Sequence, residues 1–126
     1  MIAVEVSHRE GVPVARVPLE VDAANAAQVR EELAAAMRHE AFELVVDLSR
    51  TRFIDSAGLD MLFRLRDSLA HRRATLCVVI PPDSMLQRVA EIVGLPQAIP
   101  VYDSVSEAVA AAASASPSGP SPEPEG

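Results

Sequence analysis

The chain has 126 residues, of which 49% are hydrophobic, and it carries a formal net charge of −7 at pH 7. That length fits one domain with a single hydrophobic core. The acidic balance argues against a nucleic-acid partner, because a nucleic-acid-binding surface needs clustered lysine and arginine. No apolar run approaches the ~18 residues of a membrane span, and Met1–Val6 does not resemble a signal peptide. We therefore expect a cytoplasmic protein.

The first elements expected are a hairpin and a helix. Residues 2–6 and Val12–Val17 alternate in polarity on either side of a turn-like segment, which predicts two antiparallel strands. Pro13 and Pro18 disfavour a long central strand at the second run. The next segment is then a link that leads to Asp22, the expected cap of a helix over Ala23–Arg38. That helix has one apolar face, formed by Val29, Leu33, Ala36 and Met37.

The middle of the chain carries the most informative stretch. Leu44–Leu48 is an apolar run that predicts a buried strand. After a polar link come Phe53-Ile54 and the tetrad Asp55–Gly58, followed by apolar residues at helical spacing as far as about Arg72. The tetrad therefore lies where a helix begins, with Asp55 or Ser56 as its N-cap.

The remaining elements continue the alternation of strand and helix. Thr75–Ile80 is a third apolar strand, and a helix capped by Asp83 or Ser84 then runs to a stop at Gly94. Ala98–Tyr102 predicts a short final strand, and Ser104–Glu107 is a capping box that opens an alanine-rich last helix. Residues 113–126 are rich in serine, proline, glycine and glutamate, so we expect a disordered tail there.

The resulting order, β-β-α-β-α-β-α-β-α, predicts an α/β domain over residues 1–112. Strands that alternate with helices form mainly parallel sheets with right-handed crossovers, and the opening hairpin adds an antiparallel edge. Sites in such sheets form at the carboxyl ends of strands. Asp22 and the Asp55-Ser56 pair both follow predicted strands, so we expect them to be neighbours in space.

Ser56 is the candidate modification site. A hydroxyl at a helix N-terminus lies near unpaired backbone N–H groups and the positive end of the helix dipole, which favour a phosphate. Gly58 has no Cβ and leaves room for a backbone or a phosphate to approach. The structural alternative is an ordinary N-cap followed by a small residue that eases packing.

Signals for catalysis, cofactors or metals are weak. No nucleotide-binding loop and no serine nucleophile elbow is present. His8, His39 and His71 lie in turn or helix-end contexts without metal-ligand spacing, and Cys77 is expected in the core. Asp47 lies within the central strand, where a buried acid needs a partner. It could bond to backbone N–H groups or accept a phosphoryl group as in receiver domains, but the chain lacks the lysine of those sites.

Four segments together resemble a known family. They are Leu19–Ala24, Leu44–Ser49, Phe53–Leu59 and Val89–Leu95. Their order and spacing are similar to a STAS domain of the anti-sigma factor antagonist type, the bacterial partner-switching proteins, over roughly residues 12–109. The resemblance implies a STAS-like fold, a small mixed and mainly parallel β-sheet flanked by helices.

The resemblance also implies a function. Ser56 would be phosphorylated by a partner that is both an anti-sigma factor and a serine kinase. The unphosphorylated form would bind that partner and free a sigma factor, and a serine phosphatase would restore the form that binds. Asp22 and Asp55 would flank the phosphoserine and contact the partner, together with the segment Ser56–Asp60. The ATP would belong to the kinase, so the chain would be no enzyme and would need no cofactor.

Three positions depart from the family pattern. Leu19 replaces a common glycine before the acidic Glu20, Ala57 replaces a frequent second hydroxyl residue, and Asp60 replaces a small residue. The acceptor Ser56 is intact, whereas recognition by a particular kinase is open. The alternative is a constitutive STAS scaffold, or a subunit of a lipid-transport or stress-sensing complex, in which Ser56 is only a helix cap.

Overall fold

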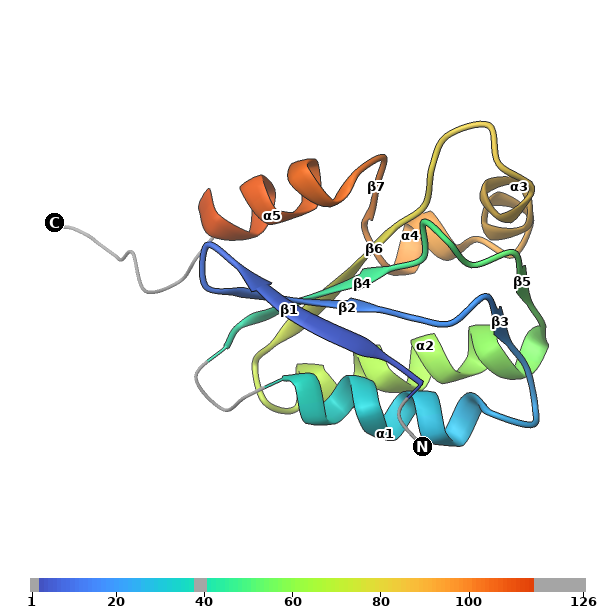
Figure 1. Ribbon diagram of the computed structural model, residues 1–126, viewed down its shortest axis with the longest axis horizontal. Helices are drawn as coiled ribbons and strands as arrows, with labels where there is room; N and C mark the ends of the chain where they lie inside the picture. Colours follow the sequence, from blue (N-terminus) through green and yellow to red (C-terminus); the bar gives the residue numbers. More distant parts are fainter. Residues whose placement is uncertain (1–2, 38–40, 115–126) are drawn as a thin grey trace, which may run out of the picture.

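The computed structural model describes residues 3–37 and 41–114. Five strands form one sheet in the order β1-β2-β4-β6-β7, and two further strands, β3 and β5, pair with each other (Figure 1). The elements in chain order are β1 (Glu5–Arg9), β2 (Val12–Arg16), β3 (Glu20–Val21), α1 (Ala26–Ala36), β4 (Glu43–Asp47), β5 (Phe53–Ile54), α2 (Ser56–Ala70), β6 (Thr75–Val79), α3 (Met85–Ile92), α4 (Leu95–Ala98), β7 (Val101–Tyr102) and α5 (Val105–Ser114).

The opening hairpin is confirmed, with a shifted first strand. β1 and β2 pair antiparallel in a register that sets Arg9 opposite Val12. The two residues between them, Glu10 and Gly11, have φ angles of 53° and 80°. Positive φ at both positions is the geometry of the tight hairpin turn whose twist matches that of the strands. This turn fixes the pairing, so β1 begins at Glu5 and not at residue 2.

All other pairings in the main sheet are parallel, as the alternation of elements predicts. β2 is an inner strand of only five residues, and its ladder with β4 begins at Val14. Pro13 therefore lies outside the parallel ladder, and Pro18 lies beyond the end of the strand. The two prolines limit the length of this inner strand without excluding it.

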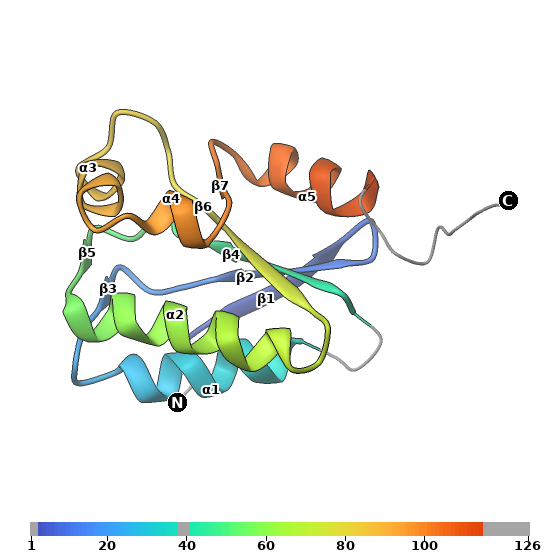
Figure 2. The same cartoon turned by 180° about the vertical axis from the view of Figure 1, so that it is seen from behind.

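Side chains alternate across the sheet and divide the core into two layers. Leu44, Val46 and Val78 belong to the larger cluster, which includes buried residues of α1 and α2. Val45 and Cys77 belong to the smaller cluster, together with Ala108 and Val109 of α5. The helices α1 and α2 accordingly cover one face of the sheet and α5 the other (Figures 1 and 2). The mixed α/β fold predicted from the sequence is confirmed.

Two short strands were not predicted. β3 lies in the segment interpreted as a link, and β5 is the Phe53-Ile54 pair before the tetrad. Each strand has two residues and gains its ladder only from the other, in the parallel register Val21 to Ile54. A pairing between residues so far apart leaves no local periodicity in either segment. The expected link at Pro18–Asp22 is thus partly a strand.

Helix boundaries also differ from the prediction. α1 begins at Ala26 with Asn25 as its N-cap, so Asp22 is not the cap of this helix. In the third helix, Ser84 is the N-cap, and its hydroxyl accepts a hydrogen bond from the Gln87 N–H at 3.1 Å. Gly94 ends the helical stretch with a left-handed φ of 77°, as expected, but the unpredicted α4 follows at once. The final strand is correspondingly shorter than Ala98–Tyr102.

The last helix begins at the predicted capping box. The Ser104 hydroxyl accepts a hydrogen bond from the Glu107 N–H at 3.1 Å. The Glu107 carboxylate accepts from the Asp103 N–H, one residue before the position that a capping box predicts. The helix continues to Ser114, so residues 113 and 114 of the expected tail are helical. The rest of the tail, like Arg38 and His39, lies outside the described residues.

Candidate functional site

The β3–β5 pair, here called the β3–β5 ribbon, brings the two predicted acidic positions together. Val21 pairs with Ile54, so Asp22 and Asp55 follow directly after a pair of matched residues. The Asp55 N–H donates a hydrogen bond to the Val21 carbonyl at 3.2 Å. The Leu19 carbonyl accepts from the N–H groups of Arg52 and Phe53 at 2.7 and 3.2 Å. The sequence-based expectation that Asp22 and Asp55 are neighbours is confirmed.

Asp55, and not Ser56, caps helix α2. Its backbone is extended, and its carboxylate accepts a hydrogen bond from the Gly58 N–H at 3.0 Å. Ser56 is the first helical residue and is exposed. Its hydroxyl has no hydrogen-bond partner among the described residues. The interpretation of Ser56 as the cap is therefore wrong, because Asp55 is the N-cap of α2.

Gly58 is buried and anchors the first turn of α2 against the β3–β5 ribbon. A Cβ at this position would lie 2.5 Å from Cγ1 of Ile54 and 3.0 Å from both Cγ1 and the carbonyl oxygen of Val21. Contacts under 3.0 Å require the neighbours to move. The sequence predicted room for a backbone or a phosphate at Gly58, and in the structure the backbone of β3 lies there. The missing Cβ of Gly58 thus allows α2 to begin in close contact with the β3–β5 ribbon.

Asp22 is half-buried and organises the turn before α1. Its carboxylate accepts a hydrogen bond from the Ala24 N–H at 3.0 Å, and its own N–H donates to the Asn25 side chain at 2.9 Å. The Asn25 amide in turn donates to the Glu20 carbonyl. Sequence reasoning missed Asn25, although an Asx residue three positions after another at a helix start is a recognisable turn signal. Together Asp22 and Asn25 fix the loop that borders Ser56.

The other predicted contact residues lie on different sides of the first α2 turns. Ala57 and Leu59 are half-buried and pack against the larger core cluster. Asp60 is exposed, and its carboxylate pairs with the Arg64 guanidinium at 2.6 Å, one turn further along. That hydrogen bond, together with the charge of Asp60, raises the pKa of Arg64. Of these three side chains, only that of Asp60 is largely exposed to solvent.

Two apolar side chains beside the site are exposed, which the sequence did not predict. Leu19 is 56% exposed and Phe53 is 50% exposed, and their backbones are hydrogen-bonded to each other. Period-two alternation explains Phe53, because Ile54, its neighbour in β5, is buried. Exposed aromatic and aliphatic groups beside a polar site are a common feature of protein interfaces.

Helix α3 adds further exposed apolar groups at the same end of the molecule. Met85 is 71% exposed and Ile92 is 83% exposed. Figures 1 and 2 place α3 at the end of the sheet where β5 and the start of α2 lie. The end that carries Ser56 is therefore rich in exposed apolar side chains.

Comparison with known proteins decides the family. The sequence model of the STAS domain family matches residues 3–108, which is most of the chain. The chain belongs to the STAS domain family. This STAS domain shows 28% identity over 112 residues to an anti-sigma F factor antagonist of Paenibacillus polymyxa, covering 86% of this chain and 92% of that one.

Solved structures agree on the fold. The crystal structure of an anti-sigma factor antagonist from Mycobacterium paratuberculosis has a TM-score of 0.76 and 26% identity, over 87% of this chain and 92% of that one. A sulfate transporter family protein from Wolinella succinogenes has a TM-score of 0.71 and 18% identity, over 85% and 88% of the two chains. The second likeness concerns the fold alone. The STAS fold is thus shared with a transporter family, so function has to be argued from the site.

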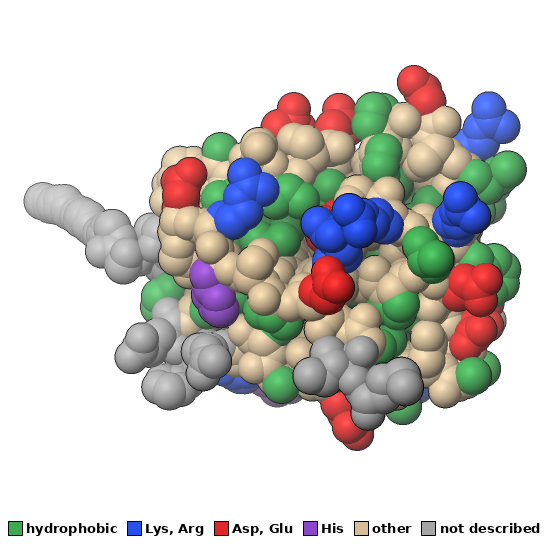
Figure 3. Space-filling view, viewed as in Figure 1, with side chains coloured by type: hydrophobic (Ala, Val, Ile, Leu, Met, Phe, Trp, Pro, Cys, Tyr) green, Lys and Arg blue, Asp and Glu red, His purple; other side chains and the backbone are tan. Residues whose placement is uncertain are grey.

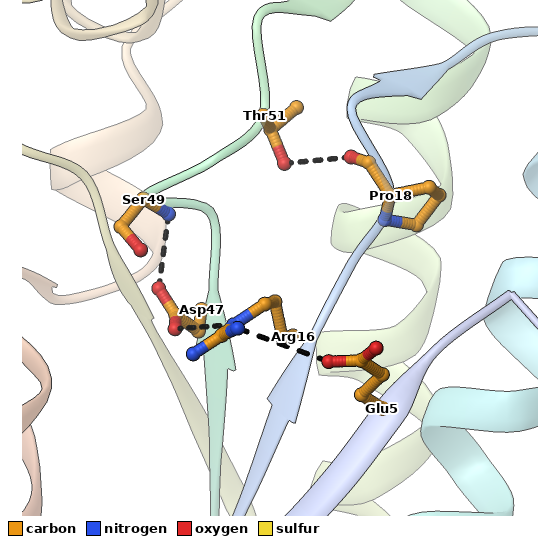
Figure 4. Close-up of polar contacts among 6 residues, drawn as sticks. All are labelled: Glu5, Arg16, Pro18, Asp47, Ser49 and Thr51. Atoms are coloured by element: carbon orange, nitrogen blue, oxygen red, sulfur yellow. Dashed lines mark hydrogen bonds and ion pairs between the residues drawn. The ribbon is translucent and has the colours of Figure 1, made fainter.

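Behind the site, the STAS domain holds a buried acid. Asp47 is 2% exposed at the carboxyl end of β4, and its carboxylate accepts a hydrogen bond from the Ser49 N–H at 2.9 Å. On the neighbouring strand β2, the Nε atom of Arg16 lies 3.6 Å from Oδ2 of Asp47. The Arg16 side chain lies between Asp47 and the exposed Glu5 (Figure 4). The expectation that Asp47 bonds to nearby backbone N–H groups is confirmed.

Thr51 links this region to the ribbon. It is buried, and its hydroxyl donates a hydrogen bond to the Pro18 carbonyl at 3.0 Å (Figure 4). The bond joins the segments that lead into β3 and β5. No sequence pattern marked Thr51, because its partner is distant along the chain. The face of the molecule seen in Figure 3 carries arginine side chains near its middle, next to acidic ones.

The remaining candidate groups are the histidines and the side chains that could hold a metal. His8 and His71 are exposed, and His39 lies outside the described residues. Within residues 3–37 and 41–114, no group of three or more metal-ligating side chains comes together. In the same part of the chain, no helix has both the length and the apolar character needed to cross a bilayer.

Proposed function

We propose that this protein is an anti-sigma factor antagonist whose binding is switched by phosphorylation of Ser56. The unphosphorylated form binds an anti-sigma factor that is also a serine kinase, and this binding releases a sigma factor. Phosphorylation ends the complex, and a serine phosphatase restores the form that binds. The names of the similar proteins support the general role. The observation that carries the proposal is the Ser56 hydroxyl, exposed and without a partner among the described residues.

The geometry suits phosphoryl transfer to Ser56. The side chain stands at the first position of a helix of 15 residues, on a rigid turn that Asp55 and Gly58 hold. The kinase would supply ATP. A bond forms between the serine Oγ and the γ-phosphorus, the bond to the bridging oxygen breaks, ADP leaves, and the hydroxyl proton passes to a base of the kinase. This protein contributes only the acceptor and its position.

The same geometry explains how a phosphate would change binding without refolding. A phosphoserine adds about −1.5 to −2 charges at neutral pH. The N–H groups and the dipole at the start of α2 stabilise such a charge within this protein. Asp55, Asp22 and Asp60 lie on or beside the same turn, so a docked partner would face several adjacent negative charges. Repulsion and desolvation of ~1–3 kcal/mol would weaken binding ~5–150-fold.

The surroundings of Ser56 suit a protein partner. Leu19 and Phe53 expose apolar surface beside the acidic residues. A buried apolar centre with a polar rim is the usual composition of a protein interface. We assign Asp22, Asp55 and Asp60 to that rim, and Gly58 to the support of the turn. Ala57 and Leu59 are half-buried and contribute less surface.

A reconstitution with purified components tests the proposal. Each anti-sigma factor of the source organism that has a kinase domain is mixed with the wild-type protein, Ser56→Ala or Ser49→Ala, and binding is measured before and after ATP is added. Ser49 is an exposed serine at the same end of the sheet and serves as the matched control. We expect ATP to release the wild-type and Ser49→Ala proteins and to leave the Ser56→Ala complex intact. Release of Ser56→Ala by ATP would contradict the proposal.

The second candidate function is the constitutive role that the sequence leaves open. A constitutive scaffold or transport subunit would bind its partner whatever the state of Ser56. Since Asp55 supplies the cap, that candidate gives the Ser56 hydroxyl no role. It predicts that Ser56→Asp binds its partner as tightly as the wild-type protein.

A further inference from the structure

A cavity of about 310 Å³ opens at the edge of the sheet, far from Ser56. It lies beside the amino-terminal half of β6, where Thr75, Leu76 and Cys77 form part of its wall. The strand β7 pairs with β6 only at Val78 and Val79, so the earlier part of this edge is left uncovered by β7. Alanines of α2 and α5 line the remaining wall, and their short side chains leave the space open. The cavity is thus a consequence of a short β7 and of the alanine-rich helix α5.

One wall of this cavity is polar and centres on Glu43. The Thr75 hydroxyl donates a hydrogen bond to the Glu43 carboxylate at 2.7 Å. Cys77 lies two residues further along β6, and burial, with a smaller contribution from Glu43, raises the pKa of its thiol to about 12. Burial raises the pKa of Tyr102 too, with further contributions from Cys77 and Glu43. Thr75, Cys77 and Tyr102 thus line the cavity together with Glu43, and the Thr75 hydroxyl is hydrogen-bonded to the Glu43 carboxylate.

The charge of Glu43 is not balanced within the cavity. Arg66 is the cation that lines the same space, but its guanidinium donates hydrogen bonds at 3.1 and 2.8 Å to Asp67. Among the described residues, no ion pair includes Glu43. The polar wall therefore presents one negative charge to an otherwise largely apolar space.

We propose that this cavity binds a small organic ammonium ion, with the ammonium group on Glu43 and an apolar body against the alanines of α5. Small-molecule sites are typically apolar cavities of ~300–1,000 Å³ with a few converging polar groups, and this cavity is at the small end of that range. The ammonium donates a charge-assisted hydrogen bond to the carboxylate, a strong interaction in a partly desolvated site. Ala108, Ala111 and Ala112 contact the apolar body.

This site is distinct from the one at Ser56. Arg66 and Ala70, in the last turns of α2, line the cavity, whereas Ser56 is the first residue of the same helix. A helix of 15 residues is about 22 Å long. Ligand binding can therefore be measured with the purified protein alone, and its outcome does not depend on the proposed partner switch.

The chain carries a built-in reporter for the test. Tyr102 lines the cavity and is the single tyrosine of a protein without tryptophan. Its fluorescence is followed while the full chain is titrated at pH 7 with cyclohexylammonium, with cyclohexanol as the neutral analogue and cyclohexanecarboxylate as the anionic one. We expect a saturable change with the ammonium, binding at least tenfold weaker with the alcohol, and no binding of the carboxylate. Equal responses to all three compounds, or no saturable response, would overturn the proposal.

Substitutions in the lining of the cavity test whether the ligand binds there. Glu43→Gln removes the charge and keeps a hydrogen-bonding group, and we expect it to weaken binding of cyclohexylammonium at least tenfold. Glu31→Gln, at an exposed glutamate of α1, is the matched control and should bind as the wild-type protein does. Ala111→Leu fills the cavity and should abolish binding, which gives a second test if Glu43→Gln does not fold. Unchanged binding in Glu43→Gln or in Ala111→Leu would show that the ligand lies elsewhere.

Discussion

The Asp55 N–H donates a hydrogen bond to the Val21 carbonyl at 3.2 Å, and this bond ties the start of α2 to the segment before α1. Because of it, Asp22 and Asp55 border one surface, although they are distant in sequence. The Asp55 carboxylate then caps the helix at Gly58, and Ser56 stands exposed between the two capping partners. The position of the candidate phosphoacceptor thus depends on a two-residue strand pairing and on one helix cap.

Gly58→Ala should destabilise the protein even though alanine is the better helix former. The added Cβ would lie 2.5 Å from Ile54 Cγ1 and 3.0 Å from the Val21 carbonyl oxygen. Overpacking costs ~1–3 kcal/mol, and the gain in helix propensity is ~0.5–1 kcal/mol. We expect a net loss of about 1–2 kcal/mol in the free energy of unfolding, measured with urea. Ser68→Ala, at an exposed position of the same helix, should change stability by less than ~0.5 kcal/mol. A Gly58→Ala variant more stable than the wild-type protein would contradict this expectation, because it would show that Ile54 and Val21 move aside at little cost in free energy.

The capping hydrogen bond of Asp55 can be tested separately from the charge of its carboxylate. Asp55→Ala removes the hydrogen bond to Gly58 and should lower the free energy of unfolding by ~1 kcal/mol. Asp55→Asn keeps a good capping group without the charge, so we expect a loss of only a few tenths of a kcal/mol. Thermal and urea unfolding of both variants measure the difference. If the two variants lost the same amount of stability, charge and not capping would be the contribution of Asp55.

Glu32 should make stability depend on pH in the acidic range. Its carboxylate accepts hydrogen bonds from Gln28 and from the N–H groups of Val4 and Ala3, which lower its pKa below the ordinary value of 4.5. A lowered pKa in the folded state adds stability above the unfolded value, and this contribution is lost as pH falls through the folded value. Glu32→Gln should therefore be less stable than the wild-type protein at pH 7, with a smaller difference near pH 3. A difference that grew on acidification would contradict these contacts.

Replacing Arg16 should lower the free energy of unfolding, because Arg16 is the cation beside the buried Asp47 carboxylate. Arg16→Met leaves the buried Asp47 carboxylate with its Ser49 N–H bond but without the nearby cation. Because the Arg16 side chain is 39% exposed and 3.6 Å from Asp47, we expect a loss of ~1–2 kcal/mol, below that of a fully buried pair. Asp47→Asn should lessen the effect of Arg16→Met, and urea unfolding of the two single variants and the double variant measures this coupling. Strictly additive losses would exclude an interaction between the two side chains.

Cys77 should be inert in the folded protein. It is 1% exposed, and burial is the main cause that raises its pKa to about 12. At pH 8 only about one thiol in ten thousand would be ionised, and the thiolate is the reactive form. We expect no reaction with a disulfide reagent within hours at pH 8, and complete reaction in denaturant. Rapid labelling of the native protein would indicate local opening of β6.

The long elements could be predicted from the sequence because each carries its own pattern. The apolar runs of β4 and β6 and the helical spacing of α2 are local signals, and all three elements lie close to the predicted positions. β3 and β5 carry no such signal, since each exists only by pairing with the other. The start of α1 was misplaced because Asp22 and Asn25 are both good capping residues, and the residues from Asp22 to Asn25 form a hydrogen-bonded turn before the helix begins at Ala26.

The candidate site was predicted in part. The tetrad Asp55–Gly58 was located at a helix start, and the expected proximity of Asp22 and Asp55 is confirmed. Which residue caps the helix depends on side-chain rotation, which the sequence does not encode locally. Exposure of Leu19 and Phe53 follows from the β3–β5 ribbon, so it could not be predicted without that pairing.

Phosphopeptide mass spectrometry of the protein from its own cells, growing and stressed, tests the central claim most directly. Trypsin releases the peptide from Phe53 to Arg64, in which Ser56 is the single hydroxyl residue, so a phosphate is located without ambiguity. We predict a phosphate on this peptide whose occupancy changes with growth condition. An abundant peptide that is unmodified under every condition would contradict the phosphorylation switch and favour the constitutive subunit.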